Sequence, residues 1–75
     1  MSYGLQVNKG RLLVGERDEI KPVIVGVLLA SGHDGVHSVQ IVADELLEKV
    51  DAFPEQVHTA NLRIIGALQV WKMEE

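Results

Sequence analysis

The chain has no cysteine, only three aromatic residues, and no apolar run long enough to cross a membrane. The absence of cysteine excludes disulfides, thiolate metal sites and thiol catalysis. The longest apolar stretch, Val23 to Ala30, is interrupted by Gly26 and falls far short of the roughly 20 residues that a membrane-spanning helix needs. The N-terminal sequence lacks a basic-then-apolar signal pattern. We therefore expect a cytoplasmic protein that does not bind membranes.

Positive charge is also scarce. Seven Lys and Arg residues stand against eleven Asp and Glu residues, which gives a formal net charge of -4 at pH 7. Lys9 and Arg11 are the closest basic pair, whereas phosphate backbones are bound by clustered positive charge, so we expect no nucleic-acid partner.

Aliphatic side chains, by contrast, are abundant. Val, Ile and Leu supply 25 of the 75 residues, which is too apolar a composition for disorder. A chain this short buries only about 60–65% of the surface that its unfolded form exposes. Apolar area left over on a soluble protein usually marks an interface. We therefore expect a homo-oligomer, most simply a homodimer.

The first half of the chain predicts strands. Leu5 and Val7 alternate with polar residues, and the sequence Asn8-Lys9-Gly10 is typical of a hairpin turn that leads into a returning strand over 12–14. The charged segment 16–21 is interpreted as a solvated loop. Residues 22–30 are rich in β-branched side chains and favour a third strand, with a helix over 18–31 as the competing interpretation.

The second half contains the clearest pattern. Apolar residues recur at three- and four-residue spacing and predict an amphipathic helix over 37–52, capped by Ser38 or Asp34 and ended by Pro54. A short helical turn at 55–60 and a strand at 62–72 are expected next. The sequence thus predicts a single small α+β domain over residues 1–75, with an N-terminal β-hairpin and two further strands packed on one amphipathic helix. The alternative is an all-α arrangement of three helices over 18–31, 36–52 and 55–73.

The segment SGHDGVH, residues 31–37, is the main candidate for a ligand site. His33 and His37 are four residues apart, as in metal-binding helices, and Asp34 would add an oxygen ligand. The neighbouring glycines, however, disfavour a continuous helix, and neither the dinucleotide fingerprint nor the P-loop is present. We favour a turn that caps the next helix, so no metal or cofactor is assigned. Ligand or metal binding by the three residues stays the alternative.

No catalytic arrangement is visible, so we expect a protein that is not an enzyme. Asp44, Glu48 and Asp51 lie on the solvated face of the predicted helix, where nothing shifts a carboxyl pKa towards acid–base work. These acids are instead available to a protein partner. The candidate interface for self-association is the apolar strip of Ile64, Leu68, Val70 and Trp71. The expected function is that of a small, acidic, non-enzymatic interaction or structural protein.

Overall fold

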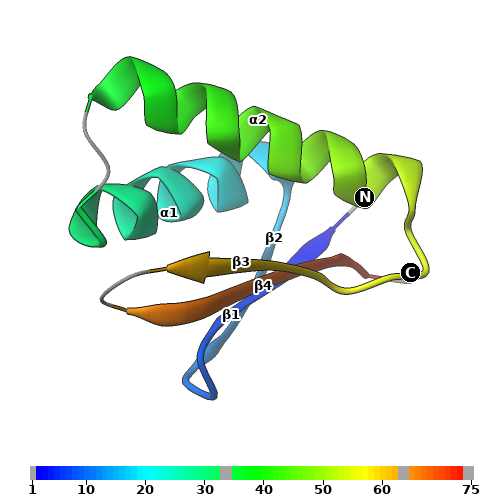
Figure 1. The fold of residues 1–75 in the computed structure, drawn as a ribbon. Coiled ribbons are helices and arrows are strands. Elements are labelled where there is room, and N and C mark those ends of the chain that lie inside the picture. Colours follow the sequence, from blue (N-terminus) through cyan, green and yellow to red (C-terminus); the bar gives the residue numbers. More distant parts are fainter. Residues whose placement is uncertain (1, 33–34, 63–64, 74–75) are drawn as a thin grey trace.

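The computed structural model has six elements in the order β-β-α-α-β-β (Figure 1). It describes residues 2–32, 35–62 and 65–73. The four strands and two helices are β1 (Tyr3–Val7), β2 (Leu12–Gly15), α1 (Arg17–Ala30), α2 (Val36–Ala52), β3 (His58–Leu62) and β4 (Gly66–Lys72). The predicted α+β class is confirmed, and the all-α alternative is wrong.

The strands form one antiparallel sheet in the order β2-β1-β4-β3. Two hairpins, β1–β2 and β3–β4, are joined through the central pair β1–β4, in which Leu5 lies opposite Val70. Both helices lie on the same face of this sheet, and no other described residues cover the opposite face (Figure 1).

The core lies between the sheet and the helices, and it contains nearly all the fully buried side chains. Alternate residues of the strands point into it, because successive side chains of a strand face opposite sides. The largest fully buried side chains come from the two central strands and both helices: Leu5, Ile24, Leu28, Val39, Leu47, Val50, Leu68 and Val70.

Residues 22–30 are helical, so the prediction of a strand there is wrong, as is that of a loop over 16–21. The N–H of Glu16 donates to Oε1 of Glu19 at 3.0 Å, the arrangement of a capping box that starts α1. The buried residues of the helix, Ile20, Ile24 and Leu28, recur every fourth position. Packing of this stripe against the core outweighs the strand preference of the β-branched residues beside it.

The predicted helix over 37–52 is confirmed as α2, and its end next to Pro54 is confirmed as well. Its start differs from the prediction. Gly35, with a φ of 83°, is the N-cap, and no side chain among the described residues makes a capping hydrogen bond, so Ser38 is not the cap. Asp34 lies outside the described residues.

The C-terminal strand is confirmed as β4, but the helical turn expected at 55–60 is wrong because β3 occupies 58–62. The N-terminal hairpin is confirmed too. Its turn residue Asn8 has a φ of 56° and reaches the other hairpin: its Oδ1 accepts a hydrogen bond from the N–H of Ala67 at 3.0 Å, and its Nδ2 donates to the carbonyl of Ile65. Asn8 therefore ties the two hairpin turns together.

Candidate functional site: the outer face of the sheet

The face of the sheet that the helices leave open carries an apolar patch. Four residues form this outer-face patch: Leu12, Val14, Val57 and Trp71. The first three are 52%, 54% and 56% exposed. Large aliphatic side chains that stay this accessible on a sheet with an otherwise complete core are typical of a contact surface rather than of solvated surface.

Trp71 lies on β4, one of the two central strands of this face. It lies directly opposite Gly4 in the β1–β4 register, and a Cβ built at Gly4 would overlap the indole ring. Val14 lies opposite Gly4 on its other side, in β2. The missing side chain of Gly4 thus lets the indole lie across β1, and the patch extends from β4 towards β2.

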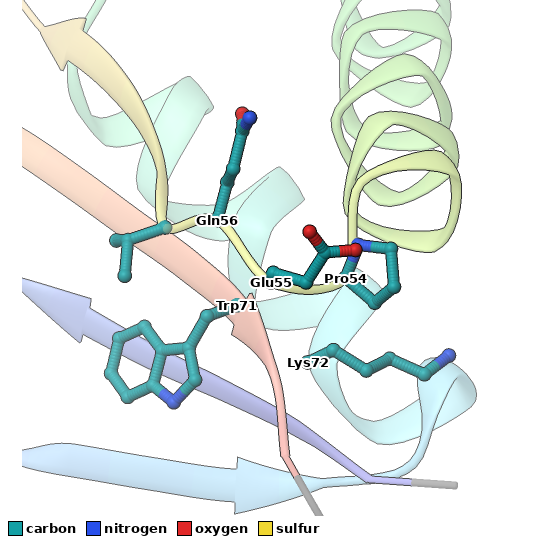
Figure 2. A pocket seen from close by; sticks show the side chains of 6 residues that line it. Pro54, Glu55, Gln56, Trp71 and Lys72 are labelled. Atoms are coloured by element: carbon teal, nitrogen blue, oxygen red, sulfur yellow. The ribbon is translucent and has the colours of Figure 1, made fainter.

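A hollow of about 430 Å³ lies where the segment before β3 meets the end of β4. Figure 2 shows that Trp71 and Lys72, its neighbours in sequence, are directed to opposite sides of β4, with Pro54, Glu55 and Gln56 along the adjoining segment. The hollow is lined mainly by apolar surface, and its one ammonium group is held by Asp51. It can receive an apolar side chain but presents no converging polar groups for catalysis.

The charged residues of the helices form a separate cluster that fastens them to the sheet. Nζ of Lys72 donates to Asp51 at 2.7 Å and lies 4.5 Å from the centre of the Tyr3 ring. The Tyr3 hydroxyl donates to the same carboxylate at 2.7 Å, and Arg17 approaches it at 3.4 Å. Asp51 therefore accepts from both central strands and from α1.

Asp44 lies two helical turns before Asp51, on the same side of α2. It pairs with Lys21 at 2.9 Å and with Arg17 at 3.4 Å. The hydrogen bond from Lys21 lowers the pKa of the Asp44 carboxyl, and the hydrogen bonds from Lys72 and Tyr3 lower that of the Asp51 carboxyl. Both carboxylates are held in the ionised state, so neither is suited to act as a proton donor or acceptor near neutral pH. We assign the cluster a structural role.

The histidine segment is described only in part, since His33 and Asp34 lie outside the described residues. His37 is exposed in the first turn of α2. α2 begins at Val36, so the predicted pairing of His37 with His33 on one helical face extends outside the described residues. Within residues 2–32, 35–62 and 65–73, no group of three His, Cys, Asp or Glu side chains is placed to hold a metal ion.

The three described residues of the predicted interface strip do not share one surface. Leu68 and Val70 are fully buried beneath the helices, whereas Trp71 points to the outer face; Ile64 lies outside the described residues. The strip was inferred from neighbours in sequence, but neighbours in a strand face opposite sides of the sheet. Sequence reasoning missed Leu12, Val14 and Val57 as surface residues, because only the strand order reveals which of their faces stays uncovered.

Comparisons with protein-family models, curated proteins and solved structures find no match, so the chain receives no family assignment from them. Neither helix in the described part of the chain is long and apolar enough to span a membrane.

Proposed function

We propose that the protein is a cytoplasmic, non-enzymatic interaction module that forms homodimers. The observation that supports this proposal is the outer-face patch, where Leu12, Val14 and Val57 are each more than half exposed. A contact with a second copy that buries part of this apolar area is favourable by about 25 cal/mol for each Å² removed from water. A two-fold symmetric homodimer, in which the same surface of both copies forms the contact, is the commonest assembly of soluble chains.

The experiment is sedimentation equilibrium of the purified protein over a wide concentration range. We expect the average mass to rise from monomer to dimer. Val14→Asp places a charge in the patch and is expected to shift the protein to monomer. Ile41→Asp is the matched control, because Ile41 is an aliphatic residue of similar exposure that lies on α2 rather than on the sheet. A wild-type protein that stays monomeric at every concentration would overturn the proposal.

A second prediction is a heterologous protein partner that binds acidic residues of α2. Fewer of these acids are available than the sequence suggests. Asp44 and Asp51 are paired with basic side chains, whereas Glu45 and Glu48 are exposed on α2, with no ion-pair partner among the described residues. A partner attracted by this helix would bind less tightly as salt is added, since exposed charges are screened.

A further inference from the structure

The edge of β2 that faces away from β1 presents unpaired backbone groups at two positions, which follow from the hydrogen-bond pattern of the sheet. In the β1–β4 pair, the N–H of Met73 donates to the carbonyl of Ser2 at 2.9 Å, and that of Asn8 donates to Ala67 at 2.6 Å. Antiparallel hydrogen-bonded pairs alternate, so the even-numbered residues of β1 bond to β4 and its odd-numbered residues bond to β2.

The partners of those odd-numbered residues in β2 follow from the register. Gly15 lies opposite Tyr3, and Leu13 lies opposite Leu5. Gly15 and Leu13 therefore direct their backbone groups to β1. Leu12 and Val14 direct their N–H and C=O groups away from the sheet, towards the free edge.

This edge lacks the usual protection against pairing. Natural edge strands are guarded by lysine, proline or a bulge, whereas β2 reads Leu-Leu-Val-Gly, with Leu13 37% exposed between its more exposed neighbours. The other edge, β3, differs. By the same alternation its outward residues are Thr59 and Asn61, which are polar. The sheet thus has one polar edge and one aliphatic edge.

We propose that β2 pairs antiparallel with β2 of a second copy, about a two-fold axis at Leu13, to form a continuous eight-stranded sheet. This inference rests on the proposed homodimer and specifies its contact. Of the outer-face patch, Leu12 and Val14 lie in this contact, beside their counterparts on β2 of the second copy, whereas Val57 and Trp71 lie outside it. Leu12 of each copy lies opposite Val14 of the other, and the two Leu13 residues face each other. All outward N–H and C=O groups of Leu12 and Val14 are then paired, which gives four hydrogen bonds between the copies.

Neighbouring registers leave groups unpaired. A two-fold axis at Val14 places Leu12 opposite Glu16, whose N–H is already bonded to the Glu19 side chain. An axis at Leu12 places Val14 opposite Gly10, whose N–H is bonded to Val7. A shift by a single residue would set the outer face of one copy beside the inner face of the other. Of these registers, only the one with its axis at Leu13 pairs every outward N–H and C=O group of Leu12 and Val14.

Charge favours the same antiparallel direction. Basic residues precede β2, at Lys9 and Arg11, and the segment that follows it, Glu16-Arg17-Asp18-Glu19, carries three acids and one base. The guanidinium of Arg17 is paired with Asp44 and Asp51 of its own copy, which leaves the segment net acidic. Antiparallel pairing brings the basic start of each strand beside the acidic end of the other, whereas parallel pairing would set like charges together. In a chain with a net charge of -4, this arrangement lowers the repulsion between two copies.

The test substitutes proline at one outward position on each edge. Val14→Pro removes an N–H that points away from β1, so the ladder within the monomer keeps its hydrogen bonds. Thr59→Pro is the matched control on the polar edge. By sedimentation equilibrium we expect Val14→Pro to raise the dimer Kd by about tenfold or more. We expect Thr59→Pro to leave it within about twofold of the wild-type value, because its edge takes no part in the pairing.

Hydrogen exchange of the wild-type protein tests the same inference without a substitution that could unfold the chain. Above the dimer Kd, the amides of Leu12 and Val14 should exchange more slowly than at high dilution, while those of Thr59 and Asn61 should not change. A dimer in which the Leu12 and Val14 amides gain no protection, or whose Kd is unaffected in a folded Val14→Pro variant, overturns edge pairing but leaves the homodimer standing. A wild-type monomer at every concentration overturns both.

Discussion

Trp71 lies across Gly4 on the outer face of the sheet, in the space that a side chain at position 4 would fill. The contact shields the backbone of Gly4 and fixes the position of the Trp71 ring. Gly4 exposes its backbone on a central strand, and the indole shields it from water; in return, the absence of a Cβ lets the ring approach β1 closely. The only tryptophan of the chain is thus held partly buried on the very face that lacks a covering layer.

Gly4→Ala should break this relationship. The new methyl group overlaps the indole, so Trp71 must turn outwards, and we expect a loss of about 1–3 kcal/mol in the free energy of unfolding. Urea denaturation measures the loss, and tryptophan fluorescence should shift to longer wavelength in the folded variant. An unchanged emission spectrum with wild-type stability would show that the indole is not held against Gly4.

Gly26→Ala should have the opposite effect. Gly26 lies inside α1, and a Cβ built there meets nothing within 4 Å. Alanine restricts the unfolded chain and favours the helix, so we expect a gain of about 0.5–1 kcal/mol in the free energy of unfolding. The same urea titration serves both glycine variants. A loss of stability on Gly26→Ala would contradict the placement of this residue on the open side of the helix.

The elements that were correctly predicted are those with a strong local signal. The β1–β2 hairpin has alternating apolar residues before Asn8-Lys9-Gly10, and α2 has an apolar stripe along its whole length. For α1, the local signals conflicted. Val23, Val25 and Val27 favoured a strand, whereas Glu16 and Glu19 at capping-box spacing and the stripe beginning at Ile20 indicated a helix.

The candidate surface was harder to predict because it depends on contacts distant in sequence. Trp71 joins the outer face through its pairing with Gly4, 67 positions earlier, and Val14 joins it through the hairpin register. The strand β3 is short and mostly polar, and its pairing with β4 decides its conformation rather than its own composition. No local pattern shows which face of a strand the helices will leave open.

Substitutions at Asn8 should separate its backbone role from its side-chain role. Asn8→Ala and Asn8→Gly both lose the hydrogen bonds to Ala67 and Ile65, but only alanine must also occupy a φ of 56°. We expect Asn8→Ala to be about 1 kcal/mol less stable than Asn8→Gly, since the left-handed conformation costs roughly that much for a residue with a Cβ. Thermal or urea unfolding of the pair gives the difference directly. Equal stabilities would mean that the turn relaxes to a negative φ in the alanine variant.

The pH dependence of stability should report the cluster around Asp51. The hydrogen bond from Lys72 lowers the pKa of the Asp51 carboxyl below its ordinary value of 3.8, and that from Tyr3 acts in the same direction. A depressed pKa in the folded state contributes stability that is present above the unfolded value and is lost as the pH falls through the folded value. The pKa of Lys72 is raised above 10.5, chiefly by the hydrogen bond to Asp51, so its contribution is lost only as the pH rises past that raised value.

The wild-type Tm should therefore fall on acidification below about pH 4, in the window set by the lowered pKa values of Asp44 and Asp51. Asp51→Asn removes one of these carboxylates, so the variant should have a lower Tm at neutral pH and a shallower fall in acid. Glu48→Gln is the control, since Glu48 is exposed on the same helix and has no ion-pair partner among the described residues. Because the Asp51 side chain is 41% exposed, added salt should also narrow the gap between wild type and Asp51→Asn at neutral pH. Parallel acid profiles for wild type and Asp51→Asn would contradict a role for Asp51 in fastening α2 to the sheet.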